Sequence, residues 1–231
     1  MRQSRENDMS EDETAEILSI DVVSDVVCPW CYLGEKRLEA ALSEEREPVV
    51  VRWRPYQLDP AIPADGLDRK EYLANKFGRD GQLKSIHDNL ARLGAEIGVR
   101  FAFDKIKRAP NTLDCHRLIR WAASANAQSK VVDRLFRAYF AEGRDVGDRA
   151  VLMDVGFECG LDSDLIGKLF AAGADIDSVC EEIAKAQAIG VTGVPFFIFA
   201  GRLAVPGAQD ASVLRRAISQ ARRAIRKARA A

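Results

Sequence analysis

The sequence has no long apolar run, and this absence limits where the protein can work. No stretch of about 18 apolar residues occurs in the 231-residue chain, so we expect no segment to cross a membrane. The first residues, MRQSRENDMSEDETAEI, contain no apolar stretch that could form the core of a signal peptide. We therefore expect a soluble, cytoplasmic protein without a membrane partner, whether translation starts at Met1 or at Met9.

An excess of charge of either sign is also absent. The chain has 34 basic and 35 acidic residues, a balance that gives no reason to expect nucleic acid as a partner. The charges are unevenly spread, however. Residues 1–14 are acidic with little to bury, and we expect them to be disordered. The last 17 residues are basic and are expected to form a solvated helix end.

Cysteine and histidine are too scarce for a disulfide framework or a structural zinc site. The five cysteines are Cys28, Cys31, Cys115, Cys159 and Cys180. A structural zinc site needs four ligands, but no second C-x-x-C exists. Cys115 and His116 are adjacent, and neighbours on a helix point about 100° apart, so they form a poor ligand pair. We expect no metal, and the three distant cysteines are expected to serve structural roles.

The hydrophobic pattern predicts a chain of mixed α and β structure. Short, apolar, β-branched or alternating segments predict the strands 17–23, 49–56, 195–200 and 202–208, the last two joined at Gly201. Apolar residues at three- and four-residue steps predict a helix from Pro29, a mostly helical block over 68–189, and a last helix over 209–228. His87 falls on a polar helix face and is expected to be solvated.

This order of elements predicts a discontinuous domain. A helix between the first two strands lets them lie parallel through a right-handed crossover. We expect residues 15–62 and 188–231 to form one α/β domain and residues 63–187 to form an all-helical insertion.

The pair of cysteines in Cys28-Pro29-Trp30-Cys31 lies where a strand meets a helix. A helix N-terminus favours an anion, and a thiolate rather than a thiol is the nucleophile in disulfide exchange. Pro29 suits the first helical position because it lacks an N–H group. We expect Cys28 to attack a disulfide and Cys31 to resolve the mixed disulfide.

The segment Gly190-Val191-Thr192-Gly193-Val194-Pro195 comes directly before a predicted strand. A proline is tolerated at the first position of a strand. Because only a small minority of X-Pro bonds are cis, composition alone predicts a trans bond before Pro195.

CPWC after the first strand and GVP before a late strand together resemble the thioredoxin superfamily. The helical insertion makes the chain DsbA-like. The segments SDVVCPWCYLG, NTLDCHRL and GVTGVPFFIF…VPGAQ resemble the FrnE-like branch, which is related to 2-hydroxychromene-2-carboxylate isomerases and kappa glutathione transferases. The resemblance implies a thioredoxin fold with a large all-helical insertion and a thiol–disulfide oxidoreductase acting on protein or small-molecule disulfides.

The resemblance also implies roles for individual residues. Pro195 is expected to be a cis-proline beside the active cysteines, with Val194 offering backbone groups to a substrate. Pro195 and Trp30 are also expected to contribute to substrate binding. Independently of the resemblance, Asp25 lies three residues before Cys28, where it either accepts a proton from Cys31 through water, raises a thiol pKa by repulsion, or is a solvated loop residue. His116 either faces the cleft or is a buried, satisfied histidine. No cofactor beyond the Cys28–Cys31 pair is implied.

Two other functions stay open at this point. Related isomerases and transferases use glutathione, and the isomerases typically have serine where Cys28 stands; the retained C-x-x-C argues against that role. A peptide-binding, chaperone-like protein is the other alternative. Glutathione or a thioredoxin-type protein is the expected recycling partner, whereas the substrate, the direction of transfer and the oligomeric state are left open.

Overall fold

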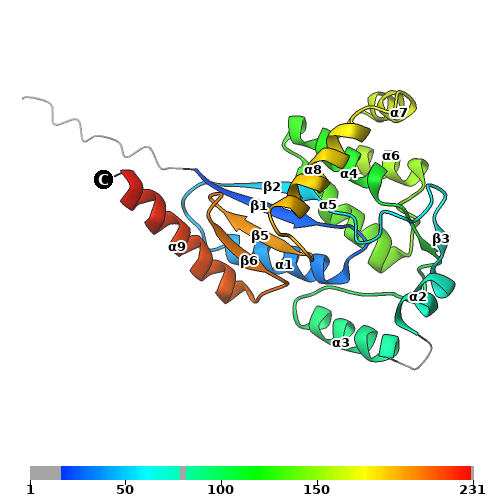
Figure 1. Cartoon of the computed structure of the whole chain (residues 1–231), viewed down its shortest axis with the longest axis horizontal. Helices are drawn as coiled ribbons and strands as arrows, with labels where there is room; N and C mark the ends of the chain where they lie inside the picture. The colour runs from blue at the N-terminus through cyan, green and yellow to red at the C-terminus, as the bar shows by residue number, and fades with distance from the viewer. Residues whose placement is uncertain (1–16, 79–81, 230–231) are drawn as a thin grey trace, which may run out of the picture.

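The computed structural model describes residues 17–78 and 82–229, so the acidic segment 1–14 lies outside the described residues. The central sheet has four strands, β1 (Leu18–Ser24), β2 (Val49–Pro55), β5 (Phe196–Phe199) and β6 (Leu203–Pro206). Their order is β2-β1-β5-β6; β1 and β2 are parallel, and the other pairs are antiparallel (Figure 1). All four strands lie within residues 15–62 and 188–231.

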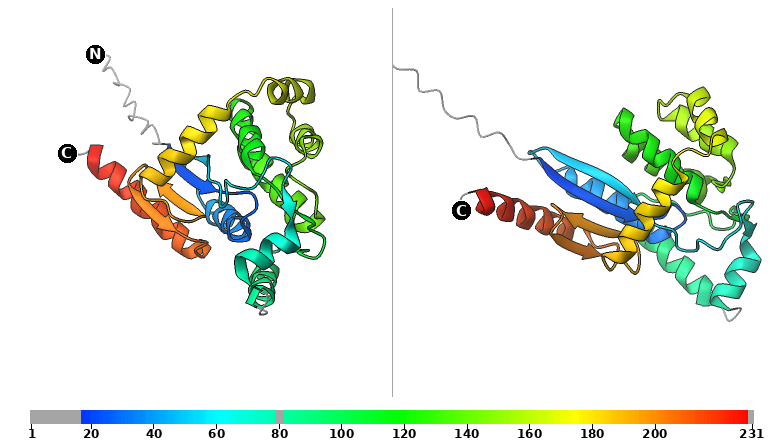
Figure 2. Two further views of the ribbon diagram at one scale, coloured as in Figure 1. Left: turned by 45° about the vertical axis from the view of Figure 1, so that its right-hand side comes forward. Right: turned by 45° about the horizontal axis from the view of Figure 1, so that its top comes forward.

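Helices cover both faces of this sheet. Helix α1 (Pro29–Leu42) joins β1 to β2 and packs beside α9 (Ala211–Arg229) on one face (Figure 1). Helix α8 (Ile176–Ala188) lies over the other face, as both views of Figure 2 show. The alternation of the strand residues explains this arrangement, because Val22 and Val23 point into different apolar clusters on the two faces.

The remaining chain between β2 and α8 is mainly helical. Its helices are α2 (Arg69–Phe77), α3 (Gln82–Glu96), α4 (Leu113–Trp121), α5 (Gln128–Phe136), α6 (Arg149–Glu158) and α7 (Ser163–Ala171), with the short η1 (Ala122–Ala125) and η2 (Arg137–Glu142). A two-residue antiparallel pair, β3 (Leu67–Asp68) and β4 (Arg108–Ala109), also lies here; the sequence has no pattern that indicates it. No described helix is long and apolar enough to span a bilayer.

One hydrophobic core connects the sheet to the insertion. On α1, the ring of Tyr32 stacks on Phe136 at 5.1 Å and on Phe140 at 6.1 Å between centroids. These residues and those of the strands belong to one continuous cluster of buried side chains. Helix α1 is therefore held from both sides, and the residues at its N-terminus have a fixed position.

Candidate functional site

The turn between β1 and α1 places Cys28 at the start of a helix. Cys28 is the N-cap residue with an extended backbone, and Pro29 is the first helical residue, as the sequence predicts. The backbone N–H groups of Cys31 and Tyr32 donate to the carbonyl of Cys28 at 3.0 and 3.3 Å. The sulfur of Cys28 therefore lies at the positive end of the helix dipole.

The two thiols differ in their position relative to a cavity. Cys28 contributes to the wall of a cavity, and its Sγ donates to the carbonyl of Val194 at 3.6 Å. Cys31 is 1% exposed and does not belong to that wall. Burial, the hydrogen bond to Cys28 and the charge on Cys28 raise the pKa of Cys31, while Ser24 and the backbone of Asp25 act in the opposite direction. Both thiols are buried, with 3% of Cys28 and 1% of Cys31 exposed, but only Cys28 borders the cavity.

The Val194–Pro195 peptide bond is cis. The trans bond predicted from composition is therefore wrong, and the cis bond implied by the family resemblance is confirmed. Composition carries only the average preference of X-Pro bonds and no information on tertiary packing. Here buried Pro195 packs on α1 at Gly34, where a Cβ atom would lie 2.9 Å from Pro195 Cγ and 3.3 Å from Phe197 Cζ.

Gly34 is thus a site residue that the sequence reasoning missed. It stands within an apolar helical pattern, and an isolated glycine in such a pattern signals a packing or functional reason. Its missing side chain lets the helix that carries Cys28 approach Pro195 closely.

A cavity of about 370 Å³, which we call the front cavity, opens beside Cys28. Cys28, Pro29, Trp30 and Val194 all belong to its wall, so the structure brings these predicted residues together. Its other walls come from α2, α3 and the segments 58–62 and 103–112. His87 also lines the cavity: it is half-buried and its ring stacks on Phe103 at 4.0 Å. The expectation that His87 is solvated is therefore wrong, because a segment outside its own helix covers it.

Asp25 and His116 meet behind the CPWC turn. Asp25 is 1% exposed; its Oδ2 accepts the N–H of Leu58 at 2.8 Å, and its Oδ1 lies 3.5 Å from His116 Nε2. His116 is 4% exposed, and its Nε2 lies 2.8 Å from the carbonyl oxygen of Tyr56. The expectation of a solvated loop at Asp25 is therefore wrong, and His116 is buried with partners.

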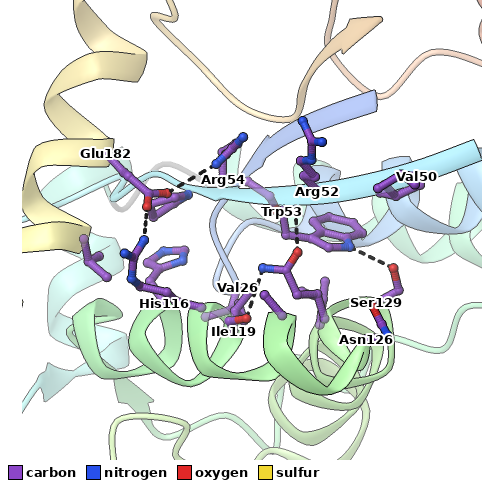
Figure 3. Close-up of a pocket in the computed structure, with 18 of the residues that line it drawn as sticks. Val26, Val50, Arg52, Trp53, Arg54, His116, Ile119, Asn126, Ser129 and Glu182 are labelled. Atoms are coloured by element: carbon purple, nitrogen blue, oxygen red, sulfur yellow. Dashed lines mark hydrogen bonds and ion pairs between the residues drawn. The ribbon is translucent and has the colours of Figure 1, made fainter. Parts of the chain in front are cut away.

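A second cavity of about 490 Å³, the rear cavity, lies between β2, α4, α5 and α8 (Figure 3). His116 belongs to its wall, but no cysteine does. Arg54 pairs with Asp21 at 2.6 Å, Arg120 pairs with Glu182, and Trp53 donates to Ser129 at 3.0 Å. The polar side chains of the rear cavity therefore form hydrogen bonds and ion pairs mainly with neighbouring protein groups.

The other cysteines are not part of either cavity. Cys115 is buried and donates to the carbonyl of Val146 at 3.0 Å, and burial raises its pKa. Cys159 is half-buried and Cys180 is exposed. Over the ranges 17–78 and 82–229, no three or more His, Cys, Asp or Glu side chains gather in a way that could hold a metal ion.

Known proteins share this architecture. The model of the DSBA-like thioredoxin domain matches residues 19–219. A probable DsbA oxidoreductase from Streptomyces coelicolor is 32% identical, with a TM-score of 0.81 over 88% of this chain and 89% of its own. An uncharacterized protein of Bacillus subtilis, YwbO, is 29% identical over 87% of this chain and 95% of its own length. The cytosolic disulfide reductase DsbM from Pseudomonas aeruginosa, solved with GSH, is 18% identical with a TM-score of 0.58, covering 92% of this chain and all of that one, and shares the fold. The predicted fold class is confirmed.

Proposed function

Since the chain belongs to the family of DSBA-like thioredoxin domains, we propose that it is a thiol–disulfide oxidoreductase that works through Cys28 and Cys31. The observation that carries this proposal is the asymmetry of the pair. Cys28 lies at a helix N-terminus in the wall of a cavity, and Cys31 is enclosed directly behind it. An attacking thiol must be reached by the substrate, whereas a resolving thiol needs to reach only its neighbour.

In the first step the thiolate of Cys28 attacks one sulfur of a substrate disulfide. The S–S bond of the substrate breaks, a mixed disulfide forms, and the other half of the substrate leaves as a thiolate. The carbonyl of Val194 faces Cys28 Sγ at 3.6 Å, so the backbone at Val194 is our candidate for the groups that hold an extended substrate segment beside the reacting sulfur.

In the second step Cys31 loses its proton and attacks Cys28 Sγ. This step releases the second half of the substrate as a thiol and leaves a Cys28–Cys31 disulfide. Ser24 and the backbone N–H of Asp25 favour the charged form of Cys31. The carboxylate of Asp25 is our candidate for the group that takes the proton, as an acid held in place by Leu58 and His116.

The oxidised protein needs a reductant in order to turn over. We propose glutathione or a thioredoxin-type protein in this role, acting in the cytoplasm. DsbM, a structural neighbour, is a cytosolic disulfide reductase solved with GSH. We propose no further cofactor, because the two thiols carry both electrons.

The direct test is insulin-disulfide reduction by wild type and by Cys28→Ser, with Cys180→Ser as the matched control. We expect Cys28→Ser to fall to the uncatalysed rate and the exposed Cys180 to be dispensable. Cys31→Ser should accumulate a mixed disulfide at Cys28, which mass spectrometry detects. Full activity of Cys28→Ser would falsify the proposal.

The same variants separate the competing functions. Glutathione conjugation that survives in Cys28→Ser would point to a transferase or isomerase. Protection of an unfolded protein from aggregation, with no disulfide exchange in wild type, would point to a chaperone.

A further inference from the structure

The front cavity is larger than access to a thiol requires. Its volume of about 370 Å³ falls in the range of roughly 300–1,000 Å³ found for small-molecule sites. Cys28 forms part of the wall. When a substrate sulfur reaches Cys28, the rest of the substrate molecule, which we call its body, would therefore lie inside the cavity. The lining of the cavity therefore indicates the chemistry of that body.

Helix α2 presents apolar side chains to this cavity. Leu73 and Phe77 belong to the wall, yet α2 contains no buried residue, and Phe77 is 37% exposed. Near Cys28 the wall adds Trp30 and Leu58, which are 37% and 41% exposed. Large apolar side chains that stay exposed around a concave site mark a surface that a ligand covers. This lining therefore suits the apolar part of a ligand.

The same helix contributes two cations. Arg69 and Lys76 are seven residues apart and share one face of α2. Arg69 donates to the carbonyl of Phe103 at 3.3 Å, and Lys76 donates to the hydroxyl of Tyr72 at 2.7 Å. Within the described part of the chain, neither cation has a carboxylate partner at ion-pair distance. A cation beside an apolar wall attracts an anionic group on a ligand.

The carboxylates in the cavity wall do not form ion pairs with Arg69 or Lys76. Asp25 accepts the N–H of Leu58 at 2.8 Å and faces His116. Asp59 accepts the N–H of Ala61 at 3.2 Å. Both acids therefore have local partners, and Arg69 and Lys76 keep their charge for a ligand.

From this arrangement we propose that the front cavity selects low-molecular-weight disulfides whose sulfur is attached to an apolar, preferably aromatic, body that carries a carboxylate. The inference rests on the exchange function proposed for Cys28. The body would contact Leu73 and Phe77, and the carboxylate would pair with Arg69 and Lys76. Two electrons pass from the Cys28–Cys31 dithiol to the substrate, which leaves as two thiols while the protein forms a disulfide.

The test is the rate at which three disulfides oxidise the reduced protein, followed by stopped flow. The probes are dithiobis(nitrobenzoate), which is aromatic and carboxylated; dithiodipyridine, which is aromatic and uncharged; and hydroxyethyl disulfide, which is small and polar. The protein carries Cys159→Ser and Cys180→Ser, so that these more accessible thiols do not contribute. We expect the rate to saturate with the carboxylated aromatic probe and to stay linear with hydroxyethyl disulfide.

Variants on α2 separate the apolar wall from the cations. Leu73→Asp should raise the half-saturating concentration of both aromatic probes about tenfold, equivalent to about 1.4 kcal/mol. Arg69→Gln should weaken only the carboxylated probe. Lys70→Gln, on the same helix but outside the wall, should change neither. Because α2 contains no buried residue, these variants are expected to fold, and an unchanged rate with hydroxyethyl disulfide checks this.

Three results would overturn the assignment. One is a linear dependence on concentration for all three probes. Another is an equal effect of Leu73→Asp on every probe. The third is a parallel loss of insulin reduction in Leu73→Asp, which would assign the cavity to a protein side chain. A failure of hydroxyethyl disulfide to oxidise the Cys28–Cys31 pair would instead refute the exchange function itself, and this inference with it.

Discussion

The front and rear cavities flank the turn before α1, and they differ in the state of their polar groups. In the rear cavity Arg54, Arg120 and Glu182 hold one another or nearby acids. In the smaller front cavity a thiol and two cations, Arg69 and Lys76, face an apolar wall, and neither cation pairs with a carboxylate of the described residues. If the substrate site were assigned by volume alone, the rear cavity would be selected. The difference teaches that the available groups of a cavity, and not its volume, indicate a binding site, and on this ground we assign the substrate to the smaller cavity as a proposal.

Asp25 is the residue that links the two sides, since it lines the front cavity and contacts His116 of the rear wall. If its carboxylate takes the proton from Cys31, Asp25→Asn will slow the second thiol release about 100-fold. The first release, driven by Cys28, should change little. Stopped-flow rates of both releases across pH provide the measurement. Asp59→Asn, the other acid of the front wall, is the control, and an equal slowing of both steps would assign Asp25 a merely structural role.

Glu35 lies on α1 outside the front and rear cavities. Its titration is therefore expected to change the stability of the fold without changing disulfide exchange. Burial raises the pKa of Glu35 to about 7, against 4.5 for the ordinary side chain. Between these values the folded state keeps a proton that the unfolded state has lost, so stability falls as pH rises from about 4.5 to about 7 and levels off above about 7. The contribution is about 3 kcal/mol. Urea unfolding across pH should show this decline in wild type and a flatter profile in Glu35→Gln, while the exposed Glu181→Gln on α8, which does not act on Glu35, should keep the wild-type slope.

A substitution at Gly34 tests the close contact between α1 and Pro195. Gly34→Ala places a methyl group 2.9 Å from Pro195 Cγ, and such overpacking costs roughly 1–3 kcal/mol. We expect lower stability in urea and slower exchange, because Cys28 moves with the helix. Gly167→Ala on α7 is the matched control: its new methyl would meet Met153 at an ordinary 3.4 Å, and the helix should gain up to about 1 kcal/mol. Equal stability of the two variants would contradict the contact.

The smallest effect is expected in the rear cavity. Glu182→Gln removes a partner from Arg120 and Arg54, and partly exposed ion pairs contribute about 0.2–1 kcal/mol. The exchange rate should not change. A tenfold loss of exchange in this variant would show that the rear cavity takes part in the chemistry.

The local features of the site could be predicted from the sequence. The change of period at Cys28 and the proline that follows it place the thiol at a helix start, and Gly201 marks the hairpin between β5 and β6. These features depend on residues close in the chain, where backbone sterics and hydrogen bonding decide the outcome.

The contacts between distant segments could not be predicted in the same way. Asp25 and His116 come from opposite sides of β2 in the chain, and only the packing of α4 on the sheet brings them together. His87 has a polar helix face around it, but Phe103 covers its ring. The front cavity depends on where α2 and α3 lie, which no local pattern encodes.

The enclosure of Cys31 has a consequence for the survival of the protein under oxidative stress. A peroxide that enters the front cavity meets the sulfur of Cys28 first and converts it to a sulfenic acid. Cys31, held one helical turn behind it, can condense with that sulfenic acid to a disulfide and expel water. The thiol that borders the cavity thus has its repair partner next to it, and this arrangement works against further oxidation to the irreversible sulfinic and sulfonic acids.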